Sequence, residues 1–263
     1  MTKTILITGA TDGIGLLAAE KLAAAGYQVL LHGRSAEKLA AAAQKVEGTA
    51  GTYLADLSDP AAVEAMATAV LADHPRVDVL INNAGILKSP TVETAAGHDI
   101  RFEVNTIAPY VLTRRLLAAI PAEGRVVNLS SAAQARIDLD AMGRFRPMGD
   151  MEAYAQSKLA ITIWTAAMAA ALPDGPVCVA VNPGSLLASK MVKEGFGIAG
   201  GDLNIGADIL VAAALSPDFA KASGQYFDND SGRFAPPDPA GADPEQIAGV
   251  MQQLAQITGL PPL

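Results

Sequence analysis

Short apolar runs alternate with helix-like segments through the first two-thirds of the chain, and this alternation limits the possible folds more than any other feature. The run Val-Cys-Val-Ala-Val at 177–181 is apolar throughout, which is typical of a strand in a parallel sheet covered on both faces. Strands are predicted at residues 4–8, 28–32, 52–55, 77–81, 125–129, 177–181 and 225–227. The pattern therefore predicts one α/β domain over residues 1–263, with a doubly wound parallel sheet of about seven strands and helices on both faces.

Helical spacing and capping residues mark the segments between these strands. Asp59 followed by Pro60, for example, is typical of a helix start. Helices are predicted at about 14–25, 36–46, 59–73, 99–106, 107–119, 152–172, 207–215 and 244–257. Residues 132–150 have no clean period and are predicted to form a loop or broken helix.

Composition excludes several classes of partner. The formal charge of −8 and the pI near 4.9 argue against nucleic-acid and anionic-membrane partners, because both attract basic surfaces. Cys178 is the only cysteine, so no internal disulfide is possible and a reducing compartment is expected. Because the N-terminal apolar run is too short for a secretory signal, and 159–172 is too short to span a bilayer, a cytoplasmic protein is predicted. With one cysteine and three scattered histidines, no metal site is expected.

Three glycines follow the first predicted strand and open the first helix. Gly9, Gly13 and Gly15 allow a tight turn, and they let backbone N–H groups at the helix start face a pyrophosphate without intervening side chains. An ordinary glycine-containing turn is the alternative. Their place between the first strand and first helix of an α/β chain favours a dinucleotide site.

Tyr154 and Lys158 lie four residues apart on a predicted helix and so share one face. A free tyrosine has a pKa of ~10 and is a poor acid–base catalyst near neutrality. An ammonium one turn away is expected to lower that pKa by favouring the phenolate. A solvated helix face is the alternative for such a pair, and the glycine loop favours the catalytic interpretation.

Together these residues carry a family resemblance. Six motifs occur in the order found in short-chain dehydrogenases/reductases: Thr8-Gly9-x-x-x-Gly13-x-Gly15, Asn82-Asn83-Ala84-Gly85, Asn105, Asn128-Leu129-Ser130-Ser131, Tyr154-x-x-x-Lys158 and Asn182-Pro183-Gly184. The long gap between Ser131 and Tyr154, and the tail at 224–260, resemble the retinol-dehydrogenase-like branch. The resemblance implies a Rossmann-type fold that binds a nicotinamide dinucleotide.

The resemblance also assigns roles to residues. Tyr154 would be the general acid/base, Lys158 would hold the nicotinamide ribose and tune Tyr154, Ser131 would orient the substrate oxygen, and Asn105 would position a relay water. Ala188 stands where the family usually has a cofactor-binding Thr, so Ser189 is expected to take over that contact. The implied cofactor-binding residues are Gly9, Thr11, Asp12, Gly13, Ile14, Gly15, Arg34, Asp56, Leu57, Asn83, Ala84, Gly85, Tyr154, Lys158, Pro183, Gly184 and Ser189.

Coenzyme choice follows from the end of the second strand. Many dinucleotide folds place an acidic residue there to bind the ribose hydroxyls, whereas this chain has Gly33 and then Arg34. A guanidinium binds a 2′-phosphate by charge-assisted hydrogen bonds, so NADP(H) is predicted to be preferred, with NAD(H) possible. Arg34 as a solvated residue before the next helix is the alternative. Asp12 complicates the prediction, because tight NADP binders in the family often carry a basic residue there.

The predicted function is hydride transfer between NADP(H) and a small-molecule carbonyl or alcohol. Residues 132–150 and 185–205 are expected to wall the substrate pocket, and their Met, Leu and Phe side chains suit a hydrophobic ketone, aldehyde or secondary alcohol. An NAD-dependent alcohol dehydrogenase and a non-catalytic NADP(H)-binding sensor or scaffold are the alternatives. Apolar helices at 107–119 and 152–172 predict a homodimer or homotetramer by family resemblance.

Overall fold

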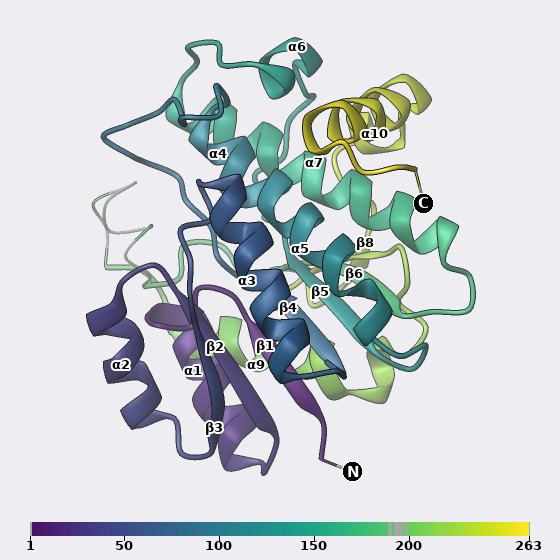
Figure 1. Cartoon of the computed structure of the whole chain (residues 1–263). Helices are drawn as coiled ribbons and strands as arrows, with labels where there is room; N and C mark the ends of the chain where they lie inside the picture. The colour runs from purple at the N-terminus through teal and green to yellow at the C-terminus, as the bar shows by residue number, and fades with distance from the viewer. Residues whose placement is uncertain (1, 189–190, 192–196, 198, 263) are drawn as a thin grey trace.

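The computed structural model describes residues 2–188, 191, 197 and 199–262. One sheet of eight strands has the order β3-β2-β1-β4-β5-β6-β7-β8 (Figure 1). The strands are β1 Thr4–Ile7, β2 Gln28–Gly33, β3 Thr49–Leu54, β4 Val79–Asn82, β5 Arg125–Leu129, β6 Val177–Asn182, β7 Tyr226–Asp228 and β8 Arg233–Ala235. The first seven pair in parallel and β8 pairs antiparallel with β7. The predicted α/β fold class, a doubly wound parallel sheet, is confirmed.

Helices cover both faces of this sheet (Figure 1). Three of them pack on one face: α3 Pro60–Asp73, α5 Ala108–Leu116 and α7 Asp150–Ala171. Three others pack on the opposite face: α1 Gly13–Ala24, α2 Ala36–Lys45 and α9 Leu203–Leu215. Near α7 lie α4 Ile100–Phe102, a π-helical turn Glu103–Ile107, α6 Leu139–Gly143 and α10 Pro244–Thr258. Short 3-10 turns occur at Leu117–Ala119, Pro217–Phe219 and Pro239–Ala242.

Strand side chains alternate between two separate hydrophobic cores. In β1, Leu6 packs into the core beneath α3, α5 and α7, whereas Ile5 and Ile7 pack into the core beneath α1, α2 and α9. All three side chains are completely buried. Because successive strand residues point to opposite faces, a sheet covered on both sides needs apolar residues at consecutive positions. This is the physical reason for the uninterrupted apolar runs.

The eighth strand, β8, is not among the seven strands that the sequence predicts. β8 has only three residues, too few to show a periodic pattern. An aromatic cluster packs this edge, since the Phe234 ring lies 5.1 Å from that of Phe227 and 5.3 Å from that of Phe219, measured between centroids. Long-range packing therefore makes a strand that local sequence does not indicate.

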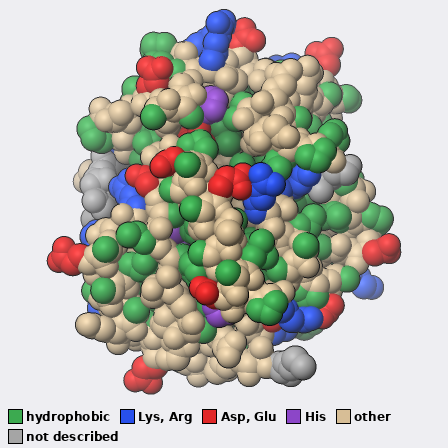
Figure 2. All heavy atoms as spheres, in the orientation of Figure 1, with side chains coloured by type: hydrophobic (Ala, Val, Ile, Leu, Met, Phe, Trp, Pro, Cys, Tyr) green, Lys and Arg blue, Asp and Glu red, His purple; other side chains and the backbone are tan. Residues whose placement is uncertain are grey.

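The surface over α3 and α5 mixes charges of both signs. Figure 2 shows acidic and basic side chains close together on this face of the molecule. Arg115 of α5 pairs with Glu64 of α3, with 2.7 Å between Nε and Oε2. Among the described residues, no helix combines the length and the apolar character needed to cross a membrane.

α10 packs against α7 of the same chain. Val250 and Leu254 of α10 are fully buried in the core that α7 shares. This contact covers part of the apolar surface of α7, which was predicted to pack against a partner subunit. The homodimer or homotetramer therefore stays a prediction.

We expect Trp164→Ala to lower the free energy of unfolding by about 3–5 kcal/mol, because it leaves a large cavity in the core. Trp164 is completely buried in α7 and packs edge-on against Tyr110 at 5.6 Å between ring centroids. Urea denaturation measures the change. The control Leu54→Ala removes a side chain that is 58% exposed and should change stability by less than about 0.5 kcal/mol. Equal losses for the two variants would contradict this packing.

Candidate active site

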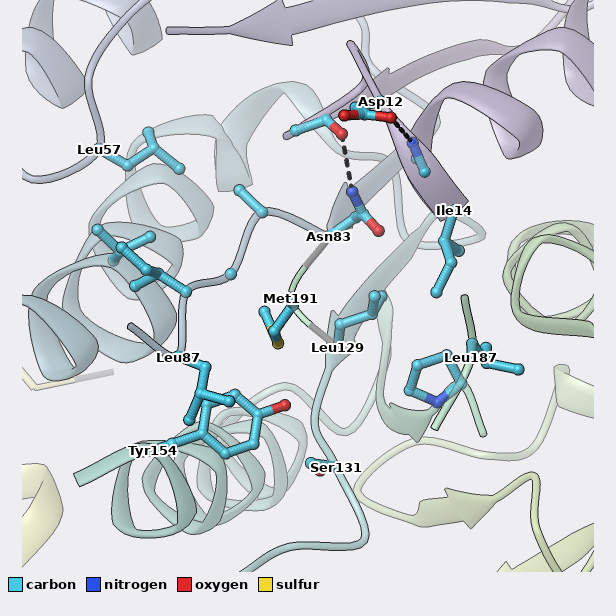
Figure 3. Close-up of a pocket in the computed structure, with 18 of the residues that line it drawn as sticks. Asp12, Ile14, Leu57, Asn83, Leu87, Leu129, Ser131, Tyr154, Leu187 and Met191 are labelled. Atoms are coloured by element: carbon cyan, nitrogen blue, oxygen red, sulfur yellow. Dashed lines mark hydrogen bonds between the residues drawn. The ribbon is translucent and has the colours of Figure 1, made fainter. Parts of the chain in front are cut away.

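A cavity of about 780 Å³ runs along the carboxyl ends of the parallel strands. Its walls come from the segments just after β1, β2, β3, β4, β5 and β6, together with the start of α7 (Figure 3). The strand order reverses between β1 and β4, where the chain has crossed from one half of the sheet to the other. Open α/β sheets bind ligands at such a switch point, outside the carboxyl ends of the strands.

The glycine loop is packed too tightly against the end of β4 to accept side chains. A Cβ on Gly9 would lie 2.9 Å from the Ala84 Cα, and one on Gly15 would collide with the Asn83 side chain and the Gly9 carbonyl. Gly13 instead faces open space, but its φ of +56° favours glycine. α1 begins at Gly13, so its first backbone N–H groups stand at the cavity, where a helix start attracts an anion.

Asn83 and Thr8 fasten this loop to the strand ends. The Asn83 Nδ2 donates to the carbonyl oxygens of Thr8 at 2.8 Å and Gly9 at 3.1 Å. In return, the Thr8 hydroxyl accepts from the backbone N–H groups of Asn83 and Ala84, each at 3.0 Å. The loop therefore has a fixed position before any ligand arrives.

His32, which the sequence interpretation considered only as a metal ligand, supports the loop from β2. Its Nδ1 accepts from the Gly9 N–H at 3.1 Å, so its Nε2 carries the proton and donates to the Ala55 carbonyl at 3.1 Å. Burial lowers the pKa of His32, although the Ala55 carbonyl and the Asp56 charge oppose the shift. Only these long-range contacts reveal the role, because no sequence spacing marks it.

The far end of the cavity is polar and holds both predicted adenosine-side residues, Arg34 and Asp56. Burial alone would raise the pKa of Asp56, but hydrogen bonds from the Ser58 backbone and hydroxyl, with the charge of Arg34, bring it below the usual value. Lys38 also lines this end, one turn into α2. The sequence interpretation missed Lys38, which belongs to no motif.

Tyr154 and Lys158 project from α7 toward the other end of the cavity, and the phenol oxygen points inward (Figure 3). The Lys158 ammonium lies 5.6 Å from the centroid of the Tyr154 ring and donates to the Leu129 carbonyl at 2.7 Å. Burial lowers the pKa of Lys158 to about 7. Burial also raises the pKa of Tyr154, opposed by the Ser131 hydroxyl. The expected lowering of the Tyr154 pKa is therefore wrong for the protein without coenzyme, because loss of hydration outweighs the hydrogen bond from the Ser131 hydroxyl.

The two serines after β5 have different environments. Ser131 lines the cavity, and its Oγ accepts from the Ala133 N–H at 3.1 Å. Ser130 is buried, and its hydroxyl contacts the Lys158 carbonyl at 3.0 Å and the Thr162 hydroxyl at 2.7 Å. The Ser131 hydroxyl can therefore donate to the Tyr154 oxygen or to a ligand in the cavity, whereas the Ser130 hydroxyl ties the strand end to α7.

Asn105 lies in the π-helical turn, fully buried behind the cavity wall. Its side chain bonds both backbone groups of Ile86, at 2.8 and 2.9 Å, and the Ser157 hydroxyl at 2.9 Å. A Cβ on Gly85 would lie 3.4 Å from both the Asn105 Oδ1 and the Lys158 Nζ, so these two groups flank Gly85. The structure thus brings Asn105 beside Lys158, and its role with a relay water stays a prediction.

Every predicted cofactor-binding residue lines this cavity except Ser189, which lies outside the described residues. Apolar lining residues that the sequence interpretation did not name include Leu87, Val104 and Met151. Each is a single residue outside any recognisable motif, so the sequence held no signal for them.

The two segments expected to wall the substrate pocket contribute unequally. From 132–150 only Ala133 lines the cavity, while Ile137 and Met142 are buried in the core with α10. From 185–205 the described lining residues are Ser185, Leu186, Leu187 and Met191, and Phe196 lies outside the described residues. The apolar pattern in 132–150 thus reflects packing beneath α10, and the later segment supplies more of the wall.

Comparison with known proteins agrees with this geometry. Residues 3–196 match the family model described as short chain dehydrogenase. Human retinol dehydrogenase 13 is 30% identical over an alignment covering 98% of this chain and 85% of the relative. An uncharacterised protein from Mycobacterium Paratuberculosis superposes with a TM-score of 0.81 at 29% identity, covering 99% of this chain and 95% of that one.

A short chain dehydrogenase from Burkholderia cenocepacia J2315, solved in complex with NADP, superposes with a TM-score of 0.70. It is 28% identical and covers 88% of this chain and 97% of its own. Family model, relatives and superposed structures all agree with the cavity and the motifs that line it. The chain belongs to the short-chain dehydrogenase/reductase family, in the retinol-dehydrogenase-like branch, and is an NAD(P)-dependent oxidoreductase.

Proposed function

We propose that the protein interconverts a hydrophobic carbonyl compound and its alcohol, with NADP(H) as the preferred coenzyme. One observation carries this proposal: a single cavity holds Ser131, Tyr154 and Lys158 at one end and Arg34 with Lys38 at the other. The first group suits proton transfer to an oxygen atom. The second group suits a phosphate.

The residues present fit a dinucleotide. Gly13 opens toward the cavity at the start of α1, so the pyrophosphate would lie against backbone N–H groups there. Lys158 would hold the nicotinamide ribose, and Pro183 and Gly184 would flank the ring. When bound, the nicotinamide supplies or takes up the hydride.

The chain's own residues handle the proton. Tyr154 donates it to the carbonyl oxygen during reduction and accepts it during oxidation. The Ser131 hydroxyl donates a hydrogen bond to the same oxygen and so orients the substrate. A water between Asn105 and Lys158 returns a proton from solvent. Burial favours the protonated phenol, which is the form that reduction requires.

Apolar side chains of the cavity define the substrate class. Leu87, Val104, Met151, Leu186 and Leu187 line the cavity, with Leu87 beside Tyr154 and Leu187 on the opposite side in Figure 3. Such a wall, with a polar anchor at Ser131 and Tyr154, suits a hydrophobic ketone, aldehyde or secondary alcohol. Retinol, the alcohol named for the human relative, belongs in the substrate panel.

NADP(H) preference rests on the two cations near the end of β2. Arg34 and Lys38 lie on one side of the cavity at the start of α2, where the helix dipole also favours an anion. Asp12 and Asp56 line the same cavity and moderate this preference by repulsion. The NADP complex of the Burkholderia protein supports the assignment by similarity.

We expect Tyr154→Phe to reduce kcat by about 10²–10⁴-fold, because removal of the hydroxyl removes the general acid. NADPH affinity, followed by fluorescence, should change little. Steady-state NADPH oxidation over aliphatic and aromatic carbonyls measures the effect. Tyr53→Phe, which removes a hydroxyl bonded to Asp73, is the matched control, because neither of these residues lines the cavity. Full turnover by Tyr154→Phe on a good substrate would refute the mechanism.

Replacing Arg34 or Lys38 by Ala should raise the KM for NADPH by about 10- to 100-fold, since a charge-assisted hydrogen bond contributes ~1.5–3 kcal/mol. The KM for NADH, which has no 2′-phosphate, should stay within a factor of about three. Parallel titrations with the two coenzymes make the comparison. An equal change for NADPH and NADH would show that neither residue recognises the phosphate.

Lys158 also makes stability depend on pH. Its pKa is about 7 in the folded protein, below the ~10.4 of an unfolded lysine. Between these values the unfolded chain binds more protons, so the Lys158 contribution to the unfolding free energy rises as pH increases.

We expect the wild type without coenzyme to gain stability relative to Lys158→Met as pH rises from about 7 to about 10. Urea denaturation across this range measures the difference. Lys45→Met, at an exposed position, should run parallel to the wild type. If the difference in unfolding free energy between wild type and Lys158→Met does not change with pH, Lys158 titrates as an ordinary lysine.

A further inference from the structure

We propose that Gln134 and Tyr226 are positioning residues for Ser131, acting through two hydrogen bonds to its carbonyl oxygen. This inference rests on the proposed function, which gives the Ser131 hydroxyl the task of orienting the substrate. Gln134 belongs to no motif that the sequence interpretation used, and Tyr226 lies in the tail at 224–260, to which that interpretation gave no role in the site. Gln134 follows β5 and Tyr226 opens β7, and their side chains meet at one backbone atom.

The geometry at this atom is specific. The Ser131 carbonyl accepts from the Tyr226 hydroxyl at 3.0 Å and from the Gln134 Nε2 at 2.9 Å. Next to it, the Ser131 Oγ accepts from the Ala133 N–H at 3.1 Å. The two donors therefore fix the peptide group that follows Ser131. The turn that begins with this peptide orients the Ser131 hydroxyl.

Tyr226 reaches Ser131 from a strand that does not pair with β5. It opens β7, while Ser131 follows β5, and β6 lies between these two strands. Strands are spaced by about 4.8 Å, so a long side chain with a terminal donor is needed to bridge this span. Tyr226 is 7% exposed, and burial and the charges of Asp228 and Asp230 raise its pKa, so the phenol stays a donor.

Gln134 uses both ends of its amide. Besides the Ser131 carbonyl, its Nε2 approaches the Ser130 hydroxyl at 3.3 Å, and its Oε1 accepts from the Asp238 N–H at 3.0 Å. Asp238 caps the 3-10 turn Pro239–Ala242 through the Ala240 N–H. This amide links both serines to the segment before α10.

The same segment contacts the catalytic helix. A Cβ on Gly241, in the 3-10 turn, would lie 3.1 Å from the Leu159 side chain, which follows Lys158 on α7. The Ser130 hydroxyl also contacts the Lys158 carbonyl. Gln134 therefore fixes the position of Ser131 relative to α7, the helix that carries Tyr154 and Lys158.

Neither Gln134 nor Tyr226 lines the main cavity, so neither can touch substrate there. Both border a separate cavity of about 240 Å³ on the other side of the Ser131 strand end. Any effect of Tyr226 on catalysis must therefore pass through Ser131, and any effect of Gln134 must pass through Ser131 or through Ser130, which contacts the Lys158 carbonyl. Misplacing a reacting group by about 1 Å can cost up to ~100-fold in rate, so loss of one of two tethers should give a moderate loss.

The test is a double-mutant cycle with isosteric variants. Tyr226→Phe and Gln134→Met remove the donors and keep side-chain volume. We expect each to lower kcat by about ten-fold while the KM for NADPH stays unchanged, because one tether remains. In a Ser131→Ala background, each should lower kcat by less than about two-fold, since the group that they position is already absent.

Matched controls separate positioning from stability. Tyr53→Phe removes a hydroxyl hydrogen bond to Asp73, and Gln246→Met removes an amide that bridges the backbone of Ile137 from α10. Both should lower the midpoint of thermal unfolding about as much as the test variants, with kcat unchanged. A kcat loss in Gln246→Met equal to that in Gln134→Met would overturn the inference, because general loosening would explain both.

The outcomes separate the two proposals. If the wild type turns over a carbonyl, and Ser131→Ala impairs it, but Tyr226→Phe and Gln134→Met do not, only the positioning inference fails. If each variant lowers kcat as much in the Ser131→Ala background as in the wild type, again only the positioning inference fails. If wild type turns over no carbonyl in the panel, or if Ser131→Ala is fully active, the proposed function fails as well.

Discussion

The contact between the glycine loop and the end of β4 is the constraint on which the site depends. Gly9 and Gly15 leave no room for side chains, so the loop can lie against Ala84 and accept the two hydrogen bonds from Asn83. His32 holds the same loop from β2. Because strands on both sides of β1 fix this turn, the start of α1 faces the cavity without help from a ligand. The remaining walls are the segments that leave the neighbouring strands at the same edge of the sheet.

Burial controls the chemistry at the other end of the cavity. Removal from water lowers the pKa of Lys158 and raises that of Tyr154, so each group is pushed toward its neutral form. A neutral phenol is a proton donor, and an amine with a pKa of about 7 can gain or lose a proton near neutrality. The pair is therefore suited to relaying protons. The dehydrated environment supplies this property, and close spacing on a helix would not supply it alone.

The sequence predicted the features that repeat or that occur at motif positions. Alternating apolar runs gave seven strands close to their observed places, and all the described residues predicted from the motifs to bind the cofactor line the cavity. It failed where long-range packing decides: β8 is too short to show a pattern, and Ile137 and Met142 serve the core under α10 although they resemble pocket residues. The spacing of Tyr154 and Lys158 also predicted the wrong direction for the Tyr154 pKa shift, because the sequence does not show how completely a side chain is removed from water. Leu87, Lys38 and Gln134 lie outside every motif, and the contact between Tyr226 and Ser131 is recognisable only in three dimensions.

The link from Asp238 through Gln134 to Ser131 has a consequence for biosynthesis. A nascent chain emerges from the ribosome in order, so the glycine loop, Ser131 and Tyr154 are all outside long before Tyr226 and Asp238. The early segments can form most of the sheet at that stage. Ser131 nevertheless lacks its contact with Gln134 in the final form until the residues near position 240 have been made, so this centre matures later than the sheet that carries it.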